Sequence, residues 1–550
     1  MIPLREQPGI RRRGLPWGKP CSPSLLAGLL VGAGFVVRLW WAAATFLNAD
    51  EALHFMAANQ YSWKQTYQAS LTLSHPPLLI FLLHLWRMFG SSEFILRFPS
   101  VLAGSAFCWI FFRWLEERFG AETGLIGLIF ASFLPPMIAL SAEIRQYAWL
   151  LFFAISSLYL LERALAQNSA AKMAYSVLCL WLATLAHYSA VLLAAALAAY
   201  SLVRMFEQPT PRSVFRMWLA GQMGELLLGS FLYFTYLSQF GRSALHGWMG
   251  DTYLHNSYFD PERHHIVIFA FTRTASVFQY VLGQAVIGDL LFLLFLAGTV
   301  LARRAGRPGS ASVQGGSLVA LLWLPFAINC GAALFDLYPY GGTRHSIFLS
   351  IFAITGISLA IERWTGRRLS WGIATAGLVV SLCNLFPSHR LPYIARADQK
   401  RSHMEEALAF VHEHIPASDL LLADNQTGLL LGHYLCQQQP FFINEWTEGL
   451  KSLRCGGYRI AATDGRVFAF TAENFFPSWE QVVSAYGLKR GDSVWVLQGG
   501  WLWEDSLARE LQARHPELHS LKVFSFGRNF TIFQLRVGEL EISIPQSRRL

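Results

Sequence analysis

Apolar runs of helix length, separated by short polar stretches, fill the chain between residues 25 and 386. A run of this kind can cross the hydrocarbon core of a bilayer as a helix. Eleven such runs predict eleven spans, near residues 25–47, 98–115, 122–141, 148–164, 173–187, 188–203, 217–237, 286–301, 316–335, 346–361 and 370–386. The pattern therefore predicts a polytopic α-helical membrane protein.

Basic residues gather at alternate ends of the predicted spans, as the positive-inside rule requires of cytoplasmic loops. They are Arg113, Arg118, Arg163, Lys172, Arg204, Arg212, Arg303, Arg304, Arg307, Arg363, Arg367 and Arg368. The segment before the first span, residues 1–23, carries Arg11, Arg12, Arg13 and Lys19, and no small-residue cleavage site follows it. We therefore expect a cytoplasmic N-terminal tail followed by a signal anchor.

One apolar run, Pro77 to Phe89, is left out of this count. It has about 13 residues, so at about 1.5 Å per residue it is too short for a hydrocarbon core of about 30 Å. Counting it as a span would reverse every later helix and move the arginine clusters to the outside. We expect it to lie on the outer surface as an interfacial or re-entrant segment.

When the spans are oriented in this way, polar stretches from distant parts of the chain meet at the outer face of the membrane. They are Asn48 to Ser74, Glu93 to Arg97, Ala142 to Tyr147, His187 with Tyr188, Asp336 to His345, and a longer loop, Ser238 to Gly283. An active site built from helices would have this arrangement, because its polar groups must meet at one membrane face.

After Phe386 the composition becomes that of an ordinary soluble protein. Periodicity there predicts one amphipathic helix and several short strands. The helix is expected at Met404 to His414, and the strands at Asp419 to Asp424, Ser493 to Leu497 and Phe530 to Leu535. We therefore expect a small α/β domain outside the membrane.

These patterns divide the chain into the tail, a membrane domain at residues 24–386 and the α/β domain at 387–550. Cys436 and Cys455 both lie in the α/β domain. A disulfide between them is permitted in an oxidising compartment, and two free buried thiols are equally natural.

Composition supports the membrane prediction, since 53% of the residues are hydrophobic and only 14% are charged. A soluble chain would carry roughly a quarter charged residues. The net charge of +9 does not indicate a nucleic-acid partner, because Lys and Arg fall at helix ends rather than in one stripe. No phosphate-binding glycine motif stands between a strand and a helix, which argues against nucleotide sugars and ATP-driven transport.

Asp50 and Glu51 directly follow the first apolar run. A carboxylate at the water boundary can remove a proton from an acceptor hydroxyl, so Asp50 is the candidate catalytic base. Glu51 could orient the acceptor or share a divalent metal ion, for which His75 is the other candidate ligand. The alternative is that both carboxylates simply end the helix in water.

Arg97, Arg145 and Arg344 are cations on the face that the positive-inside rule leaves poor in positive charge. A guanidinium group can bind two phosphate oxygens at once, which suits a leaving phosphate. The alternative for each arginine is an interaction with lipid headgroups.

Several other polar residues of the outer stretches could line a substrate pocket. They are His75, Tyr147, His187, Tyr188, Tyr338, Tyr340 and His345. Anchoring at the membrane surface explains the tyrosines about as well.

Five segments together resemble, in order, bacterial glycosyltransferases of the GT-C fold. They are Asn48 to Ala52, His75 to Leu78, Glu93 to Ser100, Glu143 to Tyr147 and Gly342 to His345. The similarity points to the protein O-mannosyltransferase family and to the aminoarabinose transferases that modify lipid A. It covers most of the membrane part, and the C-terminal domain also looks like that of the aminoarabinose transferases.

The resemblance implies a polyprenyl-phosphate sugar donor and an inverting transfer on the periplasmic side of the bacterial inner membrane. It implies Asp50 as the base and phosphate contacts from Arg97, Arg145 and Arg344. The acceptor would be a protein, lipid or glycan, and no tightly bound cofactor is required. The chain departs from such enzymes near the proline turn, where the lysine they often carry is replaced by Pro76, Leu79 and Ile80.

Two other function classes fit parts of the pattern. A transporter or flippase of lipid-linked sugars would need the same phosphate site without a base, but the chain lacks the two matching halves that many transporters have. A structural or assembly subunit would act through its soluble domain and would not need Asp50.

Overall fold

The computed structural model describes residues 22–238, 254–304, 315–386, 399–436, 450–500, 506–515, 518, 521–527 and 530–538. Most of the predicted N-terminal tail, Arg307 of the basic cluster near residue 304 and the start of the predicted C-terminal domain at residue 387 lie outside the described residues. The domain limits therefore stay predictions.

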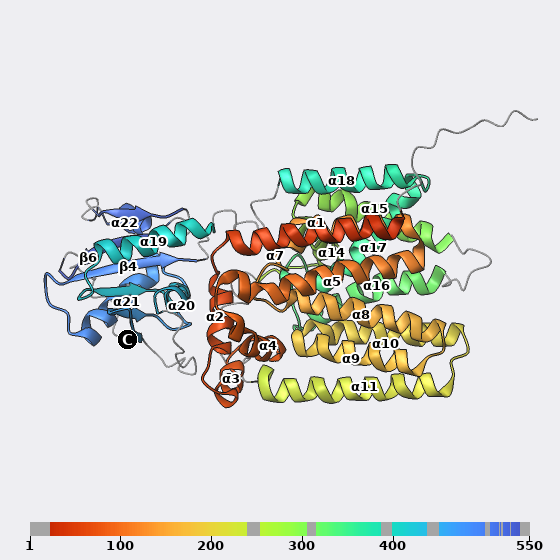
Figure 1. The fold of residues 1–550 in the computed structure, drawn as a ribbon, viewed down its shortest axis with the longest axis horizontal. Coiled ribbons are helices and arrows are strands. Elements are labelled where there is room, and N and C mark those ends of the chain that lie inside the picture. Colours follow the sequence, from red (N-terminus) through yellow and green to blue (C-terminus); the bar gives the residue numbers. More distant parts are fainter. Residues whose placement is uncertain are drawn as a thin grey trace, which may run out of the picture.

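In the first part of the chain, up to residue 386, all secondary-structure elements of the described residues are helices, and most of them run side by side in one bundle (Figure 1). Its elements are α1 (Pro23–Ala44), α2 (Ala49–Ala58), α3 (Trp63–Ser70), α4 (Leu78–Trp86), η1 (Arg87–Phe89), α5 (Glu93–Phe119), α6 (Ala121–Phe133), α7 (Pro135–Ala139), α8 (Tyr147–Ala166), α9 (Ala170–Ala186), α10 (Ser189–Glu207), α11 (Arg212–Leu232), η2 (Tyr233–Leu237), α14 (Ile266–Leu282), α15 (Ala285–Arg304), α16 (Gly315–Leu334), η3 (Arg344–Leu349), α17 (Ser350–Trp364) and α18 (Leu369–Leu385).

Each of the eleven predicted spans coincides with helix in the structure, but fewer helices are long and apolar enough to cross a membrane alone. Among the described residues, six helices meet that test, and seven if the bent pair α14 and α15 counts as one span. Helices α9 and α18 fall short with 17 residues each. The prediction missed α14, which lies in the segment expected to be an outer loop and meets α15 at 118°.

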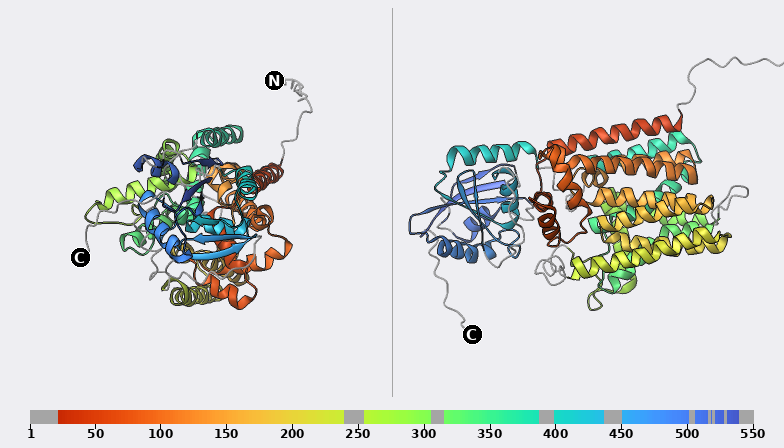
Figure 2. Two further views of the ribbon diagram at one scale, coloured as in Figure 1. Left: turned by 90° about the vertical axis from the view of Figure 1, so that its left-hand side faces the viewer. Right: turned by 60° about the horizontal axis from the view of Figure 1, so that its bottom comes forward.

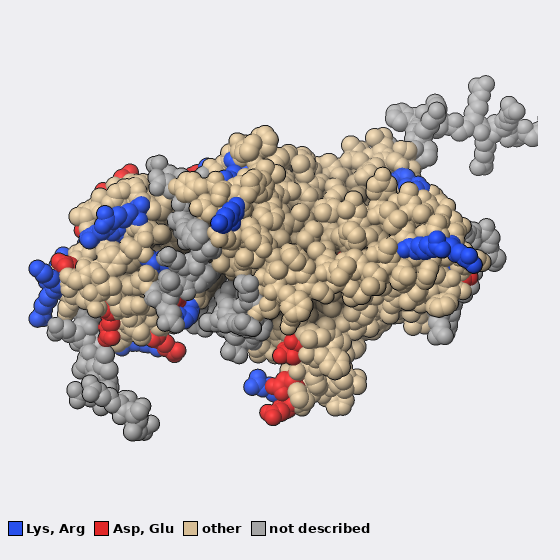
Figure 3. Space-filling model, turned by 90° about the horizontal axis from the view of Figure 1, so that it is seen from below, with Lys and Arg blue, Asp and Glu red and all other residues tan. Residues whose placement is uncertain are grey.

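The bundle has two ends with different surroundings (Figure 2). The near end touches the C-terminal part of the chain, and the far end holds the start of α1 and the ends of α5, α8 and α10. Arg118 and Arg204 at the far end both pair with Glu162, at 2.9 and 3.2 Å. Figure 3 shows one face of the molecule, with a broad band free of charged colour between basic residues at the far end and the charged C-terminal part. This distribution is that of a multi-pass membrane protein.

The predicted span at 122–141 is broken, because Pro135 and Pro136 end α6 and start the short helix α7. Arg38, from the middle of α1, is 1% exposed and binds the freed carbonyl groups. It donates to the carbonyl oxygens of Ala131 and Ser132 at 2.9 Å each. A buried cation in a membrane helix here caps the end of another helix.

The run Pro77 to Phe89 forms α4 and η1, and neither element is long enough to cross a bilayer. With α2 and α3 it forms a layer at the near end of the bundle (Figure 1). The short, surface-lying segment expected from the sequence is therefore what the fold contains.

The C-terminal α/β region contains one six-stranded sheet with the strand order β2-β3-β1-β4-β6-β5. Strands β3, β1 and β4 are parallel, and the outer pairs are antiparallel. The elements are α19 (Arg401–His414), β1 (Leu420–Ala423), α20 (Asn425–Tyr434), β2 (Lys451–Cys455), β3 (Tyr458–Ala462), α21 (Ala472–Tyr486), β4 (Ser493–Gly499), α22 (Leu507–Arg514), β5 (Val523–Ser525) and β6 (Phe530–Arg536).

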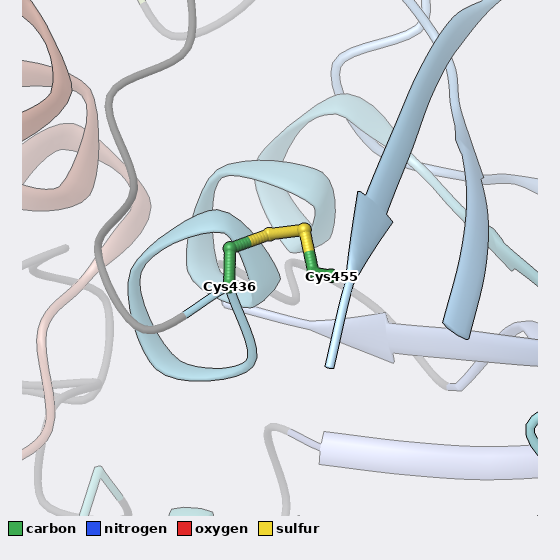
Figure 4. The surroundings of a disulfide bond; sticks show 2 residues. All are labelled: Cys436 and Cys455. Atoms are coloured by element: carbon green, nitrogen blue, oxygen red, sulfur yellow. A yellow bond between two sulfur atoms is a disulfide. The ribbon is translucent and has the colours of Figure 1, made fainter. Parts of the chain in front are cut away.

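Cys436 and Cys455 form a disulfide, which decides between the two alternatives that the sequence left open (Figure 4). It ties the end of α20 to the end of β2. The described residues thus contain one disulfide, between cysteines that are 19 positions apart in the sequence.

The C-terminal α/β region docks directly on the junction between α1 and α2. Thr45 pairs with Lys400 in an isolated antiparallel bridge, and the amide of Phe46 donates to the carbonyl of Gln399 at 3.1 Å. Phe46 and Ala52 share one hydrophobic cluster with residues of α19, α20 and the sheet. The start of the chain and its C-terminal region therefore have a common core.

Candidate active site

Asp50 and Glu51 lie in the first turn of α2, not at the end of α1 as the sequence suggested. Asn48 caps this helix: its side chain accepts from the amide of Glu51 at 3.0 Å, and the Glu51 carboxylate accepts from the amide of Asn48 at 2.9 Å. This reciprocal capping box fixes the direction in which α2 leaves the junction. Acidic residues are also favoured there by the helix dipole.

Glu51 is 1% exposed and pairs with Arg97 of α5. Both carboxylate oxygens accept from the Arg97 side chain at 2.8 Å, and one also accepts from the amide of Ile144 at 2.9 Å. The remaining N–H groups of Arg97 donate to the carbonyl oxygens of Ala42, Thr45 and Phe46. The pair therefore joins α2, α5 and the α1–α2 junction.

These contacts bear on two assignments made from the sequence. All donors of Arg97 bind protein groups here, so Arg97 holds the site together, and phosphate binding by Arg97 stays a prediction. Both oxygens of Glu51 also accept hydrogen bonds, and His75 contacts Arg145. Among the described residues no group of three or more His, Cys, Asp or Glu side chains is arranged to hold a metal ion, so a metal at Glu51 and His75 stays a prediction.

Asp50 meets the other two predicted cations. Its carboxylate oxygen Oδ2 lies 2.8 Å from Nη1 of Arg344 and 3.1 Å from Nη1 of Arg145. The Asp50 side chain keeps 20% of its surface exposed, whereas Arg145 is nearly buried at 3%. Burial alone would raise the pKa of Asp50, but the two guanidinium groups outweigh it and hold the pKa well below its usual range.

A row of imidazole rings extends from Asp50 across the near end of the bundle. Ring centroids are 5.6 Å apart from His54 to His75, 5.6 Å from His75 to His187 and 6.2 Å from His187 to His345. Nε2 of His75 accepts from Arg145 at 3.4 Å, so His75 is neutral and steadies the guanidinium group. Sequence reasoning missed His54.

Two nitrogens of this row have no hydrogen-bond partner within the described part of the chain, namely Nε2 of His54 and Nε2 of His187. Nδ1 of His54 donates to the carbonyl of Asp50 at 2.6 Å, so its Nε2 is an acceptor. Nδ1 of His187 accepts from the amide of Ser189 at 3.2 Å, so its Nε2 carries a proton. The row therefore offers one buried acceptor, on His54 next to Asp50, and one buried donor further along, on His187.

Three of the four predicted tyrosines have different placements, and the fourth, Tyr338, has its ring centroid 6.4 Å from that of His345. Tyr147 accepts from Arg145 at 3.3 Å and lies against His187, so it belongs to the site. Tyr340 is fully buried, and its hydroxyl is bonded to Thr274 at 2.6 Å, away from the row. The hydroxyl of Tyr188 is buried without a partner among the described residues.

One known sequence family matches part of this chain. The model of the dolichyl-phosphate-mannose-protein mannosyltransferase family matches residues 74–228 of this chain. The match includes His75, Arg145 and His187, and it leaves out Asp50 and Arg344. No curated protein matches the chain.

The crystal structure of ArnT from Cupriavidus metallidurans bound to undecaprenyl phosphate is similar to this structure over nearly its whole length. The identity is 12% and the TM-score 0.52, with 94% of this chain and 99% of that chain covered. The chain has the GT-C fold. The same protein in the apo state gives 11% identity and a TM-score of 0.51 over 93% and 98% of the two chains. The similarity includes both the helical bundle and the C-terminal α/β region, since 94% of this chain is covered.

Proposed function

We propose that this chain is a membrane glycosyltransferase that moves a sugar from a polyprenyl-phosphate donor to a hydroxyl or phosphate of a protein, lipid or glycan. The observation that carries the proposal is the Asp50 carboxylate between the guanidinium groups of Arg145 and Arg344, at one end of a membrane-spanning GT-C fold. That end is proposed to be the periplasmic side of the bacterial inner membrane. The basic far end would then face the cytoplasm.

In the proposed reaction Asp50 takes the proton of the acceptor hydroxyl. The acceptor oxygen bonds to the anomeric carbon from the side opposite the phosphate, so the configuration inverts. The bond between that carbon and the phosphate oxygen breaks, and its electron pair leaves with polyprenyl phosphate. The negative charge that develops on the phosphate is stabilised by Arg145 and Arg344.

Arg145 and Arg344 would link departure of the phosphate to proton removal by Asp50. A donor phosphate that binds Arg145 and Arg344 competes with Asp50 for the same donors, and two charge-assisted bonds to phosphate are strong. As the phosphate gains charge, its attraction for the guanidinium groups increases. Asp50 then loses its cationic partners, and its affinity for a proton rises when the acceptor must be deprotonated.

The free acceptor and donor nitrogens of His54 and His187 suit the hydroxyl groups of a sugar. A sugar hydroxyl can donate to the first and accept from the second. Because a buried polar nitrogen without a partner costs free energy, a sugar that satisfies both would be favoured over one that lacks either hydroxyl.

The test is transfer of radiolabelled sugar from polyprenyl-phosphate donors by the purified protein in liposomes. Asp50→Asn should lower transfer at least about a hundredfold, because the base is lost, while binding of undecaprenyl phosphate is kept or strengthened. Asp260→Asn is the control, since Asp260 is also paired with an arginine, Arg263, at 3.1 Å. Full transfer by Asp50→Asn would refute the assignment of the base. Donor that crosses the bilayer without sugar release would favour a transporter.

A further inference from the structure

One side chain of the C-terminal α/β region is hydrogen-bonded to the junction beside the candidate active site. The hydroxyl of Tyr434, the last residue of α20, accepts from the amide of Leu47 at 2.8 Å. The same hydroxyl donates to Oε1 of Glu93 at 2.9 Å. Leu47 and Tyr434 are 387 positions apart in the chain, so this contact exists only in the finished fold.

Both hydrogen-bond partners of this hydroxyl are connected to α2, the helix that carries Asp50. Leu47 immediately precedes Asn48, the residue that caps α2. Glu93 starts α5, and one turn later that helix holds Arg97, the partner of Glu51. Tyr434 therefore contacts the backbone before α2 and the start of the helix that braces α2.

The surroundings of Tyr434 make its hydrogen bonds important for its position. A cavity of about 500 Å³ lies beside it, lined in part by Glu93, Arg401, Leu408 and His433. The ring packs against two hydrophobic clusters on its other sides, and the two hydrogen bonds fix where its hydroxyl lies. The disulfide at Cys436, two residues further on, fixes the end of α20 from the other side.

We propose that Tyr434 is a positioning residue for sugar transfer, which holds the start of α2 so that Asp50 faces the acceptor. This inference rests on the proposed function for its kinetic part only. Loss of the hydroxyl leaves the Leu47 amide without its partner and removes one of the bonds that hold the junction. Arg145 and Arg344 come from other segments, so donor binding should be little affected.

The test compares Tyr434→Phe with Tyr458→Phe in the full-length protein. Tyr458 is a matched control, because it lies in the same α/β region and its hydroxyl also has two partners, the carbonyls of Val411 and Ile415 at 3.1 and 3.4 Å. Both variants should lose similar thermal stability. Only Tyr434→Phe should lower kcat, by about tenfold, with KM for the donor within about twofold of the wild type.

Hydrogen exchange measured by mass spectrometry tests the geometry without any substrate. Peptides that contain the Leu47 amide should exchange faster in Tyr434→Phe than in the wild type and in Tyr458→Phe. Unchanged exchange at Leu47 would overturn the positioning role, and so would faster exchange with unchanged kcat. If the wild type transfers no sugar, the proposed function fails, and the exchange experiment still decides whether Tyr434 holds the junction.

Discussion

The adjacent acidic residues Asp50 and Glu51 have different roles because neighbouring positions on a helix point in different directions. Asp50 turns to the exposed side and meets Arg145 and Arg344. Glu51 turns inward and pairs with Arg97. The two adjacent carboxylates look like one motif in the sequence, but only Asp50 is a candidate base. Glu51 has a structural role, since it holds α2 to α5.

Much of the site could be predicted from residue type and position. Arg145 and Arg344 stood out because arginine is unusual on the outer face, and the structure brings both to Asp50. The partner of Arg97 could not be predicted, since it depends on how α5 packs against the α1–α2 junction. His54 could have been found, because it follows Asp50 by four positions and thus lies one turn away on α2.

His54 should make stability depend on pH. Burial, followed by the nearby Arg145, lowers the pKa of His54 from 6.5 to about 3. The unfolded chain takes up a proton below about pH 6.5 while the folded protein does not, so the unfolding free energy falls as the pH falls. The loss is about 1.4 kcal/mol per pH unit, or about 2 kcal/mol between pH 6.5 and 5.

Thermal unfolding in detergent between pH 7 and 5 measures this effect. His54→Gln should be less sensitive to pH than the wild type. His412→Gln, which removes an exposed imidazole of α19, should retain the wild-type dependence. Equal pH dependence in all three proteins would contradict the prediction.

At the scale of elements, hydrophobic runs predicted where most helices lie, but they did not predict the residues at which those helices begin and end. The runs do not show that α1 ends before Asn48, because Thr45 to Leu47 are also compatible with helix. Helix α14 was missed, since its apolar face lies within a segment rich in His, Tyr and Arg. The break before α7 could have been predicted from Pro135 and Pro136.

Arg38 should be important for stability because it caps the broken end of α6. Arg38→Met leaves the carbonyl groups of Ala131 and Ser132 without this donor, at about 1–3 kcal/mol each. We expect the unfolding free energy to fall by about 2–6 kcal/mol in total. Arg113→Met, at a more exposed arginine on α5, is the control and should have little effect. An unchanged melting temperature for Arg38→Met would refute the capping role.

At the scale of the molecule, the change in composition after Phe386 predicted a separate α/β part, and β1, β4 and β6 lie where strands were expected. The order of the strands could not be predicted, because it depends on pairing between distant segments. The surface through which the C-terminal α/β region docks on the α1–α2 junction could not be predicted from the sequence either. It depends on contacts such as Phe46 with α20, which no periodic pattern specifies.

Loss of the disulfide should weaken the C-terminal α/β region. The cross-link joins residues 19 positions apart, and a loop of that length is worth about 3 kcal/mol through the entropy of the unfolded chain. The double variant Cys436→Ser and Cys455→Ser should therefore unfold at a lower temperature. Cys179→Ser removes a free thiol of α9 and is the control. Identical unfolding of the double variant and the wild type under non-reducing conditions would contradict this prediction.

The bond between Leu47 and Tyr434 also has a consequence in time. A ribosome makes the α1–α2 junction first and Tyr434 only after nearly 390 further residues, and domains generally fold in the order of their synthesis. The bond from Tyr434 to the start of α2 can therefore form only when the last quarter of the chain has been made. In a nascent or truncated chain, α2 would be held by Asn48 and Arg97 alone, so we expect such a chain to be less active than the full-length protein.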